Sequence, residues 1–121
     1  MRILTEAECR AAMEKGSFEL QKNAGAKVSE KTALILTQSW CPQWKAMKNY
    51  LPEAEKRLPG LEILYIEYDQ PPWFEEFMSF KENTYNNLEI PFVLYYNEGN
   101  CTGSSNYVSL EGFLHRLNQT A

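Results

Sequence analysis

The chain has 121 residues, with 16 acidic and 12 basic side chains and a formal net charge of -4. This acidic balance argues against a nucleic-acid-binding protein, which needs a positive face. No apolar run reaches the ~18–20 residues of a membrane span, and no apolar signal core opens the sequence, so we expect a cytoplasmic protein. Because 44% of the residues are hydrophobic, we expect one domain over residues 1–121 with a substantial core.

The start of the chain predicts a short strand followed by a helix. Arg2–Leu4 is the candidate strand. Thr5 and Glu8 have the spacing of a capping box, which predicts that a helix begins after Thr5 and ends near Lys15. Residues typical of turns then predict a loop, with some helix possible inside it: Gly16, Asn23 and Gly25.

The next segment predicts a buried strand and an amphipathic helix. Thr32–Thr37 is apolar with β-branched ends, as is typical of a strand covered on both faces. Pro42 suits the first turn of a helix, and Pro52 inside the helical pattern predicts a kink. Apolar residues recur at three- and four-residue steps along this helix: Trp44, Met47, Leu51, Ala54 and Leu58.

The second half alternates strands and helices and then ends in a hairpin and a helix. Leu61–Tyr68 predicts a strand and Trp73–Asn83 a helix. Phe92–Asn97 and Cys101–Val108 predict an antiparallel hairpin, and Ser109 caps the last helix. Strands joined through helices pair in parallel. The predicted fold class is therefore α/β, with a central mixed β-sheet of four to five strands and helices on both faces.

Cys41 is the candidate catalytic residue. It lies where the first buried strand ends and a helix begins. The first amides of a helix lack internal partners and carry partial positive charge, which favours the nucleophilic thiolate form of a cysteine there. The lone histidine, His115, lies in the last helix and is interpreted as solvent-facing. No residue spacing is typical of a zinc site, so we expect no metal.

Three motifs, in chain order, resemble those of the thioredoxin family. Trp40–Pro42 is similar to the Trp-Cys-[Gly/Pro] start of that family's redox motif. Asp69–Pro72 is similar to its Asp-Gln-x-Pro segment. Tyr85–Pro91 is similar to its Tyr-(x)4-Ile-Pro segment, which ends in a cis-proline. The resemblance extends from about Ile3 to Leu117 and implies a single thioredoxin-like domain.

The resemblance implies a site in which the Ile90–Pro91 bond is cis and lies beside Cys41. The backbone of Ile90 would pair with an extended substrate, and Pro91 would shape the turn. The alternative is an ordinary trans proline at the start of a strand. The implied substrate-binding residues are five in all: Trp40, Pro42, Trp44, Ile90 and Pro91.

The sequence also departs from the family pattern. Trp44 stands where the family has its second cysteine, so Cys41 has no resolving partner three residues later. Trp44 also falls on the apolar stripe of its helix, so packing in the core is its alternative role. Ile35 replaces the family's buried acidic residue six positions before the active cysteine, and Phe92 follows the proline where the family often has threonine.

The other two cysteines are not expected to resolve Cys41. Cys101 lies at the far end of the predicted hairpin from Pro91, ~25–30 Å away if nine or ten residues of strand intervene. A disulfide needs Cα atoms within about 7 Å. Cys9, in the first predicted helix, is interpreted as a small buried apolar residue.

Two functions from different classes fit these features. The first is a monothiol thioredoxin-like thiol–disulfide oxidoreductase without a bound cofactor. Its Cys41 would form a mixed disulfide with a protein disulfide or small thiol substrate, and an external thiol such as glutathione would resolve it. The second is a redox-inert thioredoxin-fold domain that binds a protein or peptide. Its groove would be aromatic: Trp40, Trp44, Trp73 and Phe92. A weaker third idea, glutathione conjugation, depends on two lysines near Cys41: Lys45 and Lys48.

Overall fold

A computed structural model describes residues 1–20 and 31–118, so the predicted loop positions Asn23 and Gly25 lie outside the described residues. The elements follow one another in this order: β1 (Arg2–Ile3), α1 (Glu6–Lys15), β2 (Lys31–Thr37), α2 (Pro42–Arg57), β3 (Leu61–Glu67), α3 (Phe74–Thr84), β4 (Phe92–Asn97), β5 (Asn100–Ser105) and α4 (Leu110–Leu117).

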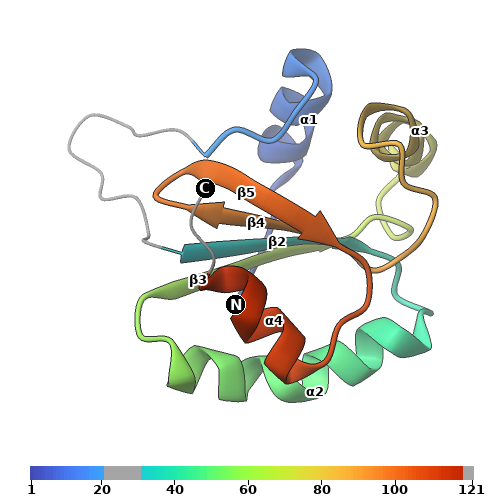
Figure 1. The fold of residues 1–121 in the computed structure, drawn as a ribbon. Helices are drawn as coiled ribbons and strands as arrows, with labels where there is room; N and C mark the ends of the chain where they lie inside the picture. Colours follow the sequence, from blue (N-terminus) through green and yellow to red (C-terminus); the bar gives the residue numbers. More distant parts are fainter. Residues whose placement is uncertain (21–30, 119–121) are drawn as a thin grey trace.

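The strands form one mixed sheet in the order β1-β3-β2-β4-β5. The β1–β3 and β2–β3 pairs are parallel, whereas β2–β4 and β4–β5 are antiparallel. Figure 1 shows α1 and α3 above the sheet and α2 and α4 below it. The predicted α/β architecture is therefore confirmed. Because Phe92, the first residue of β4, pairs with Leu36 near the end of β2, the Ile90–Pro91 turn lies at the same edge of the sheet as Cys41.

The largest difference from the predicted elements lies at the end of the hairpin. Strand β5 ends at Ser105, whereas the sequence predicts a strand up to Val108. Asn106 leaves the strand because its side-chain amide donates to the carbonyl oxygens of Pro91 at 3.1 Å and Glu89 at 3.2 Å. Helix α2 continues through Pro52.

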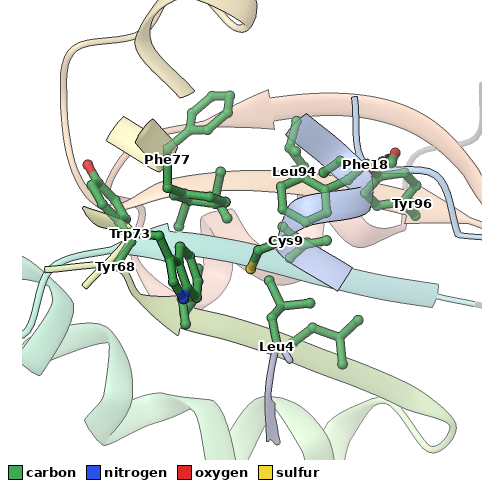
Figure 2. Packing of buried hydrophobic residues seen from close by; sticks show 14 residues of the cluster. Leu4, Cys9, Phe18, Tyr68, Trp73, Phe77, Leu94 and Tyr96 are labelled. Atoms are coloured by element: carbon green, nitrogen blue, oxygen red, sulfur yellow. Dashed lines mark hydrogen bonds between the residues drawn. The ribbon is translucent and has the colours of Figure 1, made fainter. Parts of the chain in front are cut away.

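The sheet separates two hydrophobic cores. The first, between the sheet and the α1/α3 layer, contains Cys9 and Trp73, both labelled in Figure 2. Phe92 belongs to the same core. The second, between the sheet and the α2/α4 layer, contains Cys41 and Trp44. Trp44 and Phe92 thus lie on opposite faces of the sheet. The prediction of one aromatic groove for the redox-inert alternative is therefore wrong, because its residues do not share a surface.

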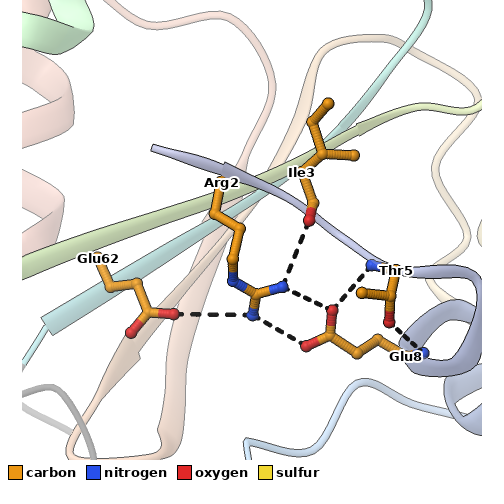
Figure 3. A network of polar contacts seen from close by, with 5 residues as sticks. All are labelled: Arg2, Ile3, Thr5, Glu8 and Glu62. Carbon is orange, nitrogen blue, oxygen red and sulfur yellow. Dashed lines mark hydrogen bonds and ion pairs between the residues drawn. The ribbon is translucent and has the colours of Figure 1, made fainter.

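A polar network fixes the start of α1 against the edge of the sheet (Figure 3). The Glu8 amide donates to Thr5 Oγ1 at 3.1 Å, and the Thr5 amide donates to Glu8 Oε1 at 2.8 Å, which confirms the capping box. The Arg2 guanidinium donates to both Glu8 oxygens at 2.8 and 3.0 Å. These hydrogen bonds, that from Arg2 above all, lower the pKa of Glu8 to about 2. Among the described residues, no helix has the length and apolar character needed to cross a bilayer.

Candidate functional site

Cys41 occupies the N-cap position of α2, with an extended backbone and no side-chain capping bond. Its sulfur lies 3.8 Å from the carbonyl oxygen of Ile90. The Ile90–Pro91 peptide bond is cis, so the turn implied by the resemblance lies against the cysteine. Cys41 is only 4% exposed and packs in the α2/α4 core. The predicted cysteine and proline turn therefore form one site, but most of the Cys41 surface is covered.

A carboxylate on the neighbouring loop holds the segment before Cys41 in place. Asp69 accepts hydrogen bonds from the Ser39 amide at 2.7 Å and the Ser39 hydroxyl at 2.6 Å. Gln70 Nε2 donates to the same hydroxyl at 2.9 Å and to Asp69 at 3.0 Å. Burial acts to raise the pKa of Asp69, but these hydrogen bonds outweigh it and hold the pKa below its ordinary value. The Asp69–Gln70 motif thus fixes the residues that lead into Cys41.

The predicted substrate-binding residues differ widely in exposure. Trp40 is 61% exposed, and its indole N–H donates to the Gln38 side chain. Pro42, at the first position of α2, is exposed. Ile90 is half-buried and Pro91 is buried. Trp40 and Pro42 are therefore available to a ligand from solvent, whereas Pro91 shapes the turn from beneath.

Trp44 is fully buried, which corrects its assignment as a substrate contact. Its indole N–H donates to Glu67 Oε2 at 2.8 Å, and the centre of its ring lies 5.5 Å from the centre of the Tyr65 ring. Lys48 Nζ lies 3.5 Å from the same Glu67 oxygen and 5.4 Å from the Trp44 ring centre. The side chain at the position of the family's second cysteine is thus a structural element of the core between α2 and the sheet.

A surface cavity of about 450 Å³ adjoins the proline turn. It is lined by Gln43, Leu88, Glu89, Ile90, Asn106 and Tyr107. Ile90 joins this cavity to the site, because its carbonyl also contacts the sulfur of Cys41. Leu88 and Tyr107 are among the few large exposed hydrophobic residues of the described chain. The large exposed hydrophobic side chains near the site are therefore Trp40, which was predicted, and Leu88 and Tyr107, which were not.

The remaining cysteines do not reach Cys41. Cys9 is buried in the core on the opposite face of the sheet, and burial raises the pKa of its thiol to about 12. Cys101 is exposed on β5 and pairs with Tyr96, five residues along the chain from Pro91. Five residues of strand span about 16 Å, less than the predicted 25–30 Å but still beyond disulfide reach. Within the described residues, no three His, Cys, Asp or Glu side chains gather as a metal site.

A polar cluster that was not predicted from the sequence lies behind the proline turn. Lys81 is fully buried, and its Nζ donates to the carbonyl oxygen of Glu89 at 2.5 Å and to Asn87 Oδ1 at 3.3 Å. The burial of Lys81 is indicated by its position in the sequence, because Lys81 follows Phe77 by four residues and so lies on the buried stripe of α3. Asn106, whose side-chain amide also donates to the Glu89 carbonyl and to Asn87 Oδ1, carries no comparable signal in the sequence.

The whole fold is similar to those of solved thioredoxins. Thioredoxin O1 of Arabidopsis thaliana matches with a TM-score of 0.62 and 17% identity, over 97% of this chain and 96% of that one. Mitochondrial thioredoxin 3 of Saccharomyces cerevisiae matches with a TM-score of 0.64 and 14% identity, over 97% and 92%. Fasciola hepatica thioredoxin matches with a TM-score of 0.61 and 16% identity, over 98% and 100%.

These likenesses show that the chain has the thioredoxin fold. No protein-family model matches the sequence, and no curated protein matches it at a significant level. The resemblance found in the three motifs is thus confirmed for the fold.

Proposed function

We propose that the protein is a monothiol thiol–disulfide oxidoreductase in which Cys41 is the nucleophile. The observation that carries the proposal is the position of its sulfur, at the N-terminus of α2 and 3.8 Å from the carbonyl oxygen of Ile90 in the cis-proline turn. A helix N-terminus carries partial positive charge, which stabilises negative charge that develops beside it. The turn offers the Ile90 backbone as a pairing edge for an extended peptide, beside the cavity bordered by Leu88 and Tyr107.

The proposed reaction has two exchange steps. The Cys41 thiolate attacks one sulfur of a substrate disulfide, so a bond forms between Cys41 and that sulfur while the other sulfur leaves as a thiolate. The thiolate of an external thiol, such as glutathione, then attacks the substrate sulfur of the mixed disulfide, so a new bond forms between these two sulfurs and Cys41 leaves as a thiolate. The second step needs an external thiol because Cys9 lies in the opposite core and Cys101 lies beyond disulfide reach.

Burial of Cys41 favours a second candidate, a redox-inert binding domain. A thiol that is 4% exposed and packed in a core behaves as a small apolar residue unless the covering groups move. In this case the exposed side chains near the turn, Trp40, Leu88 and Tyr107, would bind a partner while the sulfur stays unreacted.

Intact-mass measurements with glutathione disulfide distinguish the two candidates. In a Cys101→Ser protein, which keeps Cys41 and the buried Cys9, we expect one glutathione adduct that excess reduced glutathione removes. The matched control, Cys41→Ser in the same background, should form none. An adduct that survives in the control, or no adduct in either protein, would instead support the redox-inert domain.

A further inference from the structure

Lys81 is a buried cation for which the described residues provide no carboxylate in hydrogen-bond reach. No ion pair is found for it among the described residues, and its Nζ contacts only the Glu89 carbonyl, the Asn87 amide oxygen and the face of the Phe92 ring, 5.6 Å from the ring centre. Burial lowers the pKa of Lys81 to about 8, although the charges of Glu82 and Glu89 act in the opposite direction. Such a cation is costly to bury, so its position calls for a physical explanation.

Asn106 holds the same segment from the other side. Its Nδ2 donates to Glu89 O at 3.2 Å, Pro91 O at 3.1 Å and Asn87 Oδ1 at 3.1 Å. The Asn87 amide donates back to Asn106 Oδ1 at 3.0 Å, and the Glu89 N–H donates to Asn87 Oδ1 at 3.0 Å. The carbonyls on both sides of Ile90 are therefore fixed by side chains from two elements distant in sequence, α3 and the loop that follows β5.

We propose that Lys81 and Asn106 are positioning residues that hold the backbone of Ile90 in the geometry that pairs with a peptide substrate. The inference deepens the proposed function and rests on it. Pairing with an extended peptide requires the turn to present its backbone groups at a constant angle and distance. Neither side chain is needed to touch the substrate for this, since both act on the residues that flank Ile90.

Lys81 is not needed to satisfy the two oxygens to which it donates, because each of them accepts a hydrogen bond from another donor. The Glu89 carbonyl still accepts from Asn106, and the Asn87 oxygen still accepts from both the Glu89 amide and Asn106 when the ammonium is removed. An apolar side chain of similar length would avoid burying a charge without leaving either oxygen unpaired. The ammonium therefore adds a second hydrogen bond, from a charged donor, to the Glu89 carbonyl.

Hydrogen exchange of the Glu89 amide tests the positioning role without any substrate. In Lys81→Met we expect this amide to exchange about tenfold faster, the change produced by losing one hydrogen bond to a charged group, while Lys81→Arg restores most of the protection. Asn106→Ala should act in the same direction, and the exposed-lysine control Lys56→Met should leave the amide unchanged. Exchange within twofold of the wild-type rate in both Lys81→Met and Asn106→Ala would overturn the inference.

A second comparison separates this inference from the proposed function. We would measure the rate of Cys41 adduct formation with a short peptide disulfide and with glutathione disulfide, and take their ratio. The ratio should fall about fivefold or more in Lys81→Met and in Asn106→Ala, recover in Lys81→Arg, and stay constant in Lys56→Met. If wild-type protein reacts with neither disulfide, the proposed function fails, and the Glu89 amide still decides whether the two residues hold the turn.

Discussion

Replacing Trp44 by alanine is expected to lower the free energy of unfolding by about 3–5 kcal/mol, the range for removing a large aromatic side chain from a core. The side chain is fully buried, and its indole N–H is bonded to Glu67. The cavity left behind would lie between the sheet and α2, the helix whose N-cap is Cys41. Urea unfolding followed by circular dichroism measures the effect.

Trp40→Ala is the matched control for this prediction. Trp40 lies four residues earlier and is 61% exposed, so its loss should change stability by no more than about 0.5 kcal/mol. If the two variants lose similar stability, or if Trp44→Ala is as stable as wild type, then Trp44 is not the core residue described here. A Trp44→Cys variant, which creates the two-cysteine spacing of the family, should be destabilised for the same reason.

Lys81→Met is expected to raise the free energy of unfolding at pH 7 by about 1–3 kcal/mol, because it removes a charge whose burial is unfavourable. The same variant is expected to lower the protection of the Glu89 amide against hydrogen exchange. If Lys81 served only to stabilise the fold, its removal would lower both the free energy of unfolding and the exchange protection of this amide. Opposite changes in global stability and local protection are therefore the signature of a residue retained for the geometry of the turn.

The pH dependence of this stability difference follows from the lowered pKa of Lys81. Folded Lys81 releases its proton near pH 8, whereas unfolded lysine holds it to about 10.5, so between these values the unfolded state binds more protons. Lys81 thus makes wild-type stability rise with pH in this window, at up to about 1.4 kcal/mol per pH unit. Contributions from Cys9 and the buried tyrosines, which act in the opposite direction, are common to both proteins and cancel.

Unfolding of wild type and Lys81→Met at several pH values from 7 to 9.5 measures this directly. The stability advantage of the variant should be constant below pH 8 and shrink above it. An advantage that does not change with pH, or a variant less stable than wild type at pH 7, would contradict the assignment of Lys81 as a buried, unpaired cation.

The helices and strands could be predicted well from residues that lie close together in the sequence. Thr5 and Glu8 form the predicted capping box, and Ser109 accepts from the Gly112 amide at the start of α4, as a capping residue does. The cysteine before Pro42 and the Ile90–Pro91 step both lie where the family resemblance implied. These features depend on residues close in sequence, whose hydrogen bonds and backbone preferences are readable from the chain itself.

Features that depend on contacts between segments distant in the chain could be predicted less well from the sequence. The sequence placed Trp44 and Phe92 in one aromatic groove, but strand pairing puts them on opposite faces of the sheet. Strand β5 ends early because Asn106 bonds with the Pro91 carbonyl, a contact across 15 positions of sequence. The degree to which neighbouring groups cover Cys41 likewise depends on how α2, the turn and α4 pack together, which periodicity does not specify.

The most direct test of the account is the relative reactivity of Cys41 and Cys101 in the folded wild-type chain. Cys101 is exposed on an edge strand, whereas Cys41 is nearly covered, so exposure alone predicts that Cys101 reacts first. With limiting glutathione disulfide and peptide mapping by mass spectrometry, the account predicts that Cys41 reacts on the order of tenfold faster, because it is the proposed nucleophile and lies at a helix N-terminus beside the proline turn. The preference should vanish in urea. Faster modification of Cys101 in the folded protein would contradict the proposal that Cys41 is the nucleophile.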